Sequence, residues 1–201
     1  MVCIGVVLNI KFYENERLDI DMKYNEELVT AFMEAVSNAF LSLKKTHKEH
    51  FYYYAFIFDE SLHPYISAWS YEALEKSMIE NKITDEEKDW WKWDYSDSPY
   101  AIYGYEEYFQ EVSELLDQRE DSISSDELYD IEWDIRVDSM EEAMKRLDQS
   151  GLFGSGEDRN NVVINVELAP PDGSEYERAL RLNAASSLLS EYLEWCEKEE
   201  D

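Results

Sequence analysis

The run of aromatic and aliphatic residues from Phe51 to Phe58 (FYYYAFIF) constrains the fold more than any other part of this chain. Side chains of a β-strand alternate between two faces, and in this run both alternating sets are apolar. A strand of that composition belongs in the middle of a sheet that is covered on both sides. The run therefore predicts a central strand, with Tyr54 and Phe56 buried.

Three other segments have the length and composition of strands. They are Val2–Phe12, Pro64–Trp69 and Asn161–Leu168. The residues Asp59-Glu60-Ser61 form a turn sequence, so we expect the segments on either side of them to pair as an antiparallel hairpin.

Helical patterns occupy most of the remaining chain. Capping residues mark two of the expected starts: Asn25 precedes a helix to about Lys48, and Ser70 precedes a short helix over 71–78. Two further helices are expected over Gly104–Arg119 and Glu175–Lys198. Another is expected after the pair Thr84 and Glu87, and one more begins at Ser124, restarts at Ser139 and ends near Gly151.

These helices do not alternate regularly with the strands. We therefore expect an α+β fold, in which a small, mainly antiparallel sheet is flanked by several helices. A length of 201 residues fits a single domain over residues 1–201.

The chain is strongly acidic. It contains 47 Asp and Glu residues against 18 Lys and Arg, a formal net charge of −29. Residues 104–142 alone hold fifteen acidic residues against Arg119 and Arg136. Such a field repels nucleic acids and anionic membranes, and it speeds the encounter with basic proteins. We therefore expect no nucleic-acid and no membrane partner. A basic protein fits the charge, although acidity also promotes solubility without any partner.

The sequence favours a cytoplasmic protein. Its two cysteines, Cys3 and Cys196, are too few for the disulfide framework of a small secreted protein. The apolar segment Val2–Ile10 lacks the basic start and the length of a signal peptide. No run approaches the roughly 20 apolar residues of a membrane span.

No motif specifies a catalytic, cofactor or metal site. His47, His50 and His63 lack the further ligands at defined spacing that a metal motif requires. The glycine-rich loop 151–156 leaves a helix and enters a strand, which reverses the order of elements in a phosphate-binding loop. We therefore expect a chain that is not an enzyme and that binds no cofactor or metal.

The segment Trp90–Tyr95 (WWKWDY) allows two interpretations. Alternate rings could fill the core, or the segment could form a contact surface, because Trp and Tyr are favoured anchors in protein interfaces. Nearby acidic residues make it a poor surface for nucleic acid.

From about residue 28 to residue 192 the chain resembles the bacterial domain-of-unknown-function family 4303. The resemblance rests on Ala39-Phe40, Phe51–Asp59, Pro64–Ser70, Trp93–Tyr100, Gly151–Gly154 and Asn165–Glu167. It implies a compact bacterial protein and carries no catalytic residues. By analogy, such proteins are similar in kind to small proteins encoded beside polymorphic toxin genes, where immunity proteins are often acidic.

The sequence thus favours an acidic cytoplasmic binding protein, interpreted as an immunity protein that occludes a basic toxin domain such as a nuclease. Helical spacing would align two stripes of exposed carboxylates for this contact. The residues are Glu107, Glu111 and Glu114, and Glu127, Asp130 and Asp134. Two alternatives stay open: an acidic housekeeping domain of unknown role, and an enzyme. A pocket with convergent polar groups and shifted pKa values would favour the enzyme.

Overall fold

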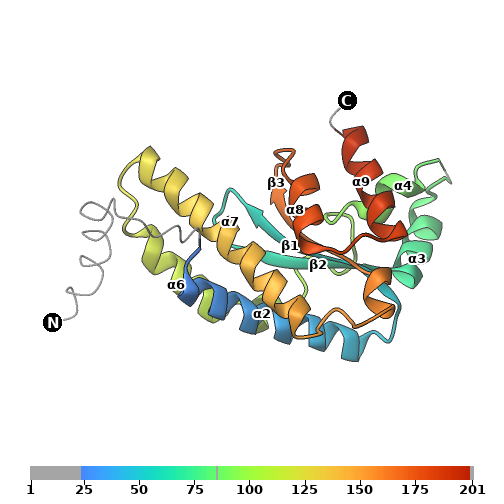
Figure 1. Cartoon of the computed structure of the whole chain (residues 1–201), viewed down its shortest axis with the longest axis horizontal. Coiled ribbons are helices and arrows are strands. Elements are labelled where there is room, and N and C mark those ends of the chain that lie inside the picture. The colour runs from blue at the N-terminus through green and yellow to red at the C-terminus, as the bar shows by residue number, and fades with distance from the viewer. Residues whose placement is uncertain (1–23, 85, 200–201) are drawn as a thin grey trace.

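A computed structural model describes residues 24–84 and 86–199 of the chain (Figure 1). The strand expected at Val2–Phe12 and the thiol of Cys3 lie outside these residues. Within them the chain is an α+β protein, which confirms the predicted fold class.

Within the described residues the sheet has three strands, in the order β2-β1-β3. β1 spans Phe51–Asp59, β2 spans Tyr65–Ser70, and β3 spans Val163–Ala169. β1 and β2 form the predicted antiparallel hairpin, whereas β3 pairs with β1 in parallel, so the sheet is mixed. A parallel pair needs a long crossover connection, and the helices between β2 and β3 provide it.

β1 is the central strand, as the aromatic run predicts. Its residues 52–58 are all buried, including Tyr54 and Phe56 with exposures of 2% and 0%. The strand is therefore packed on both faces, which is why neither alternating set of its side chains is polar.

Eight α-helices surround the sheet among the described residues. They are α2 (Glu26–Thr46), α3 (Tyr71–Asn81), α4 (Lys88–Trp93), α5 (Tyr105–Tyr108), α6 (Gln110–Glu120), α7 (Asp126–Gln149), α8 (Glu175–Leu182) and α9 (Ser187–Glu199). The predicted caps are present: Asn25 Oδ1 accepts from the Leu28 amide at 3.0 Å, and Ser70 Oγ accepts from the Ala73 amide at 2.9 Å.

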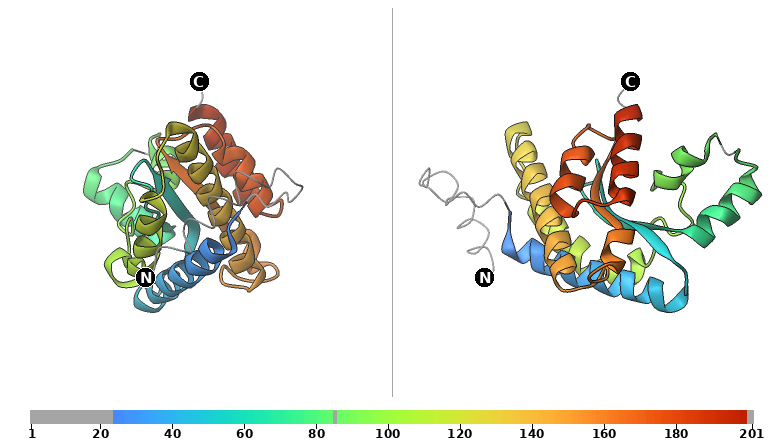
Figure 2. Two further views of the ribbon diagram at one scale, coloured as in Figure 1. Left: turned by 90° about the vertical axis from the view of Figure 1, so that its left-hand side faces the viewer. Right: turned by 45° about the vertical axis from the view of Figure 1, so that its right-hand side comes forward.

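The helices form a layer on each side of the sheet (Figures 1 and 2). On one face, Phe56 of β1 lies edge-on to Phe32 of α2, and Phe58 contacts Trp133 of α7. On the other face, Tyr53 contacts Trp93 of α4 and Tyr192 of α9. This second layer, with α8 beside β3, covers the buried polar side chains of Glu167, Glu175 and Arg178.

Three helix predictions were wrong in detail. The helix expected over Glu175–Lys198 is two helices, because Asn183 leaves the helical conformation and its side chain bonds both the amide and the carbonyl of Ile164 in β3. The helix expected over Gly104–Arg119 is divided at Phe109, whose buried ring packs on Tyr105.

The restart expected at Ser139 does not occur, because α7 is continuous over Asp126–Gln149. Ser139 is buried, and its hydroxyl donates to the Ile135 carbonyl one turn earlier. The hydroxyl oxygen of Ser139 also accepts a hydrogen bond from the Asn25 amide at 2.9 Å. The side chain thus joins α7 to the start of α2.

Candidate functional site

The acidic residues of 104–142 are mostly on the surface. Of the fifteen, ten are exposed, four are partly exposed, and Glu132 alone is buried. The six carboxylates that the sequence singles out are all among the exposed ones. They are Glu107, Glu111 and Glu114 on α5 and α6, and Glu127, Asp130 and Asp134 on α7.

None of these six carboxylates forms an ion pair with a described basic residue. Glu114 only accepts a long hydrogen bond from Gln110, at 3.4 Å. By contrast, Glu132, Glu141 and Glu142 of the same segment are paired with arginines. The six therefore keep their charge available to a partner.

Glu107 and Glu111 share a groove between α2 and α5–α6. The groove encloses about 230 Å³ and is also lined by Glu34 of α2, with Tyr108 and Val112 supplying apolar wall. None of its lining residues is basic. A lysine or arginine side chain of another protein would meet three carboxylates there. Glu114, one turn further along α6, does not line the groove. The helix break at Phe109 separates Glu107 on α5 from Glu111 and Glu114 on α6, so the predicted stripe does not lie on one continuous helix.

The three acidic residues of α7 keep their common face, because α7 is regular through this stretch. The buried guanidinium of Arg136 holds α7 against its neighbours: it donates to Glu132, to Glu120 of α6 and to the Leu62 carbonyl. Arg119 of α6 adds a bidentate pair with Glu132, with both distances at 2.7 Å. The acidic helices thus form a firmly connected surface.

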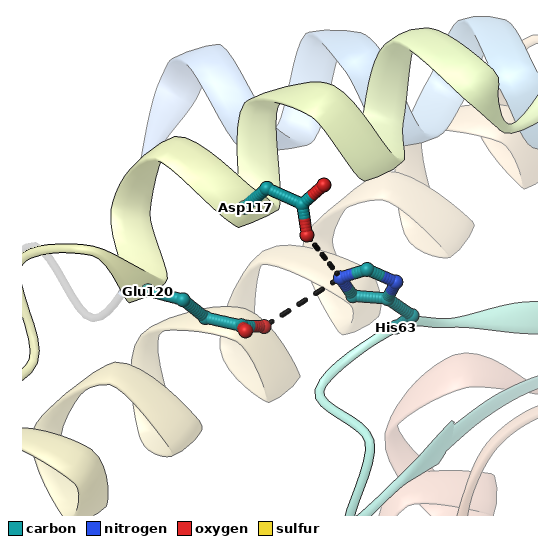
Figure 3. Close-up of side chains that lie close together, drawn as sticks. All are labelled: His63, Asp117 and Glu120. Atoms are coloured by element: carbon teal, nitrogen blue, oxygen red, sulfur yellow. Dashed lines mark ion pairs between the residues drawn. The ribbon is translucent and has the colours of Figure 1, made fainter.

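One histidine does meet carboxylates, which the sequence does not indicate. The turn after β1 places His63 Nε2 at 3.1 Å from Asp117 Oδ1 and 3.5 Å from Glu120 Oε1 of α6 (Figure 3). The two carboxylates stand three residues apart on one face of that helix. His63 Nε2 has no hydrogen-bond partner among the described residues. When the imidazole is protonated, this nitrogen is close enough to both carboxylates to form ion pairs.

Three donors of this kind can hold a divalent cation. Glu120 Oε1, however, also accepts from Arg136 Nη1 at 3.2 Å. The permanent charge of that guanidinium opposes a second cation at the same oxygen. We therefore interpret the group as a contact between the hairpin turn and α6, which is an ion pair only when the imidazole is protonated. The other two histidines lie elsewhere: His50 bonds Glu72, and His47 lies against Tyr100.

A second concentration of polar groups lies inside the molecule, beside β3. Glu167 is 4% exposed, and its Oε1 accepts from Tyr53, Tyr192 and Asn165 at 2.5, 2.5 and 3.1 Å. Burial raises the pKa of this carboxyl, against the opposing effect of the two tyrosine hydroxyls and of Arg178. The pKa values of both tyrosines are raised as well, chiefly by burial.

Unpartnered polar atoms gather around this carboxyl. Six buried side-chain nitrogen or oxygen atoms of the described residues have no hydrogen-bond partner. Four of them belong to residues that surround Glu167, namely Asn165, Glu175, Arg178 and Trp195. Buried polar atoms are nearly always paired in native proteins, so their concentration at one place is unusual.

A pocket of about 250 Å³ opens beside this group. Its lining includes Trp90, Tyr95 and Trp195 together with Asp94, Glu167 and Glu175. Sequence reasoning missed the pocket, since its lining comes from four separate segments. The available signal was one carboxylate, Glu167, in the mainly apolar strand sequence NVVINVEL, together with Asn165 two residues earlier.

Trp90–Tyr95 is divided between the core and the surface. Trp93 is fully buried in the core, whereas Trp90 is 53% exposed at the mouth of the pocket. Cys196 is buried on α9, as its apolar pattern indicates.

None of the helices within residues 24–84 and 86–199 has both the length and the apolar character needed to cross a membrane.

Comparison with curated proteins and with proteins of solved structure finds no match to this chain. A family model does match, over residues 30–184, which is most of the chain and includes the whole sheet, the acidic helices and Glu167. That family is described as a domain of unknown function, DUF4303, and the chain belongs to it.

Proposed function

We propose that this protein is an acidic, cytoplasmic binding protein, and that it acts as an immunity protein toward a basic toxin domain such as a nuclease. The observation that carries the proposal is the group of exposed carboxylates on α5–α7 that have no described ion-pair partner. Carboxylates left without intramolecular partners keep their full charge for a basic surface.

The mechanism is occlusion. Lysine and arginine side chains that bind the toxin's own substrate would meet the carboxylates of α5–α7, and one of them would enter the groove lined by Glu34, Glu107 and Glu111. Tyr108 in the groove wall offers an aromatic anchor of the kind that is enriched at interfaces. The same charge, −29 in total, disfavours nucleic acid and anionic membranes as partners.

The test replaces Glu107, Glu111 and Glu114 together by Gln and measures association with the toxin domain encoded next to the protein's gene. The variant should associate more slowly at low salt, and the difference should shrink once the Debye length falls below about 10 Å, near 0.1 M salt. The free energy of unfolding should hold or rise slightly, because like charges at this spacing repel each other.

A matched control carries the same charge change on the C-terminal helices. Glu177, Glu194 and Glu197 are exposed on α8 and α9, so their replacement by Gln removes three charges from another surface. The proposal requires a larger loss of association rate for the α5–α6 variant than for this control. Equal association rates for the two variants would mean that the acidic residues of α5–α6 serve solubility and not binding.

A further inference from the structure

The pocket beside Glu167 differs from the acidic surface in both composition and place. It lies between α4, the residues after it, the end of β3, α8 and α9, on the face of the sheet opposite α2 and α7. Its lining consists of three aromatic and three acidic residues together with Ser96 and Pro171, and no described basic residue lines it.

The aromatic side chains form the more open part of the pocket. Trp90 is 53% exposed, and its ring lies 6.4 Å from that of Trp195 at an interplanar angle of 67°. Tyr95 is held in place by its hydroxyl, which donates to the Leu168 carbonyl at 3.2 Å. The two indole rings pack nearly edge to face, so a group in the pocket lies against them and not between them. The face of an indole attracts cations.

The buried part of the pocket is acidic. Glu167 uses Oε1 for three hydrogen bonds. Glu175 is only 5% exposed, and its Oε2 has no hydrogen-bond partner. A buried carboxylate oxygen without a donor is costly, because nothing replaces the water that it loses on folding.

One basic residue acts on Glu167, and two of its three nitrogens are engaged in hydrogen bonds. Arg178 acts on Glu167 through its charge, but its Nε donates to the Val166 carbonyl at 2.7 Å and its Nη1 donates to Ser174 Oγ. Its Nη2 faces Asp172 at 3.6 Å. None of these nitrogens has Glu175 as a hydrogen-bond acceptor.

We propose that this pocket binds a small organic cation, an alkylammonium or guanidinium group, whose N–H donors satisfy Glu175 and whose charge lies against Trp90 and Trp195. Anionic ligands are opposed by the three carboxylates. The volume of about 250 Å³ lies below the roughly 300–1,000 Å³ of sites for drug-sized molecules, so it suits one such group with a short carbon chain. The group can come from a free amine or from the end of a basic side chain of another protein.

The experiment is calorimetric titration of the protein with n-butylammonium, with n-butanol as the neutral molecule of the same length, and with the peptide acetyl-Gly-Lys-Gly-amide. Saturable binding of butylammonium, with butanol at least tenfold weaker, supports the proposal. Tighter binding of the peptide than of butylammonium assigns the cation to a protein side chain, and the reverse assigns it to a free amine. Equal binding of butanol and butylammonium, or no binding of either cation, overturns the proposal.

Two variants locate the site. Glu175→Gln should weaken butylammonium binding at least tenfold, and Trp90→Ala should weaken it severalfold. Trp90 is more than half exposed, so that variant keeps the fold even if the change at buried Glu175 does not. Glu177→Gln, on the exposed side of the same helix, is the matched control and should leave binding unchanged. Unchanged affinity in Trp90→Ala and in a folded Glu175→Gln also overturns the proposal. None of these variants touches α5–α7, so the result is independent of the toxin-binding test.

Discussion

Two buried charged residues are accommodated in different ways. Arg136 is fully buried, and each of its nitrogens donates to a carboxylate or to a backbone carbonyl. Glu167 is buried among neutral donors, two tyrosine hydroxyls and an amide. A buried charge is tolerated when it is paired and fully bonded, and otherwise its protonation shifts. Arg136 is paired and fully hydrogen-bonded, so its charge is tolerated in the interior. Glu167 has no such ion pair among the described residues, and its pKa is raised.

The pKa of Glu167 predicts a dependence of stability on pH. Because burial raises this pKa above the unfolded value of about 4.3, the folded state holds a proton that the unfolded state has released. The contribution of Glu167 to stability is therefore complete below about pH 4.3 and is lost as pH rises through the folded pKa. Gln at position 167 does not titrate, so Glu167→Gln serves as the reference. As pH rises from about 4.3 to the folded pKa of Glu167, the free energy of unfolding of the wild-type protein, measured in urea melts, should fall relative to that of the variant. A difference that is independent of pH would contradict the shift.

Phe56 tests the central strand itself. Its ring is fully buried and lies 5.4 Å from that of Phe32 at an interplanar angle of 79°. Phe56→Ala removes a large aromatic group from a packed core, so the free energy of unfolding should fall by about 3–5 kcal/mol. Leu41→Ala is the comparison, because Leu41 is 52% exposed and should change the value by no more than about 0.5 kcal/mol. A loss of under about 1 kcal/mol for Phe56→Ala in urea melts would mean that the strand is not packed on both faces.

At the scale of elements, the sequence predicts best what is decided locally. The central strand, its hairpin partner and the caps at Asn25 and Ser70 follow from residues that are adjacent in the chain. The helix division at Asn183 could not be predicted in this way, because its cause is a pair of hydrogen bonds to Ile164, nineteen residues earlier. The parallel pairing of β1 with β3 and the pocket around Glu175 likewise depend on distant segments.

The end of α7 was predicted at Gly151, and its geometry explains why glycine stands there. Gly151 has φ +86°, its amide donates to the Asp148 carbonyl, and the Leu152 amide donates to the Leu147 carbonyl. This is the Schellman arrangement, in which the residue after the helix takes the left-handed conformation.

Gly151→Ala should therefore destabilise the protein by roughly 1–2 kcal/mol, the cost of the left-handed conformation for a residue with a Cβ. Apart from Gly151 and its chain neighbours, no atom of the described residues lies within 4 Å of the added carbon, so a steric clash contributes nothing. Gly151→Asn should cost less, because Asn tolerates this conformation better. Thermal melts of both variants show which of them loses more stability. An equal loss of stability for Ala and Asn would argue against the left-handed backbone conformation as the cause.

On the scale of the whole molecule, charge is the dominant property. Surface pairs such as Arg146–Glu26 and Arg181–Glu141 oppose the repulsion among acidic residues, but exposed pairs contribute only about 0–1 kcal/mol each. The pair between Arg136 and Glu132 is buried and is little affected by salt. The excess of 29 negative charges has no such compensation within the chain. Repulsion should therefore outweigh the exposed pairs.

This balance predicts that added NaCl stabilises the protein. Salt screens both the repulsion and the exposed ion pairs, and with a net charge of −29 the first effect is the larger. The urea midpoint should rise as NaCl increases from about 0.01 to 0.5 M, because the Debye length then falls from about 30 Å to a few ångströms. The variant with Gln at positions 107, 111 and 114 lacks three of the repelling charges, so its midpoint should start slightly higher and rise less steeply. A midpoint that falls with salt would mean that the ion pairs outweigh the repulsion. In that case repulsion among the exposed carboxylates of α5–α7 would not destabilise the unbound protein, and a basic partner would gain nothing by relieving it.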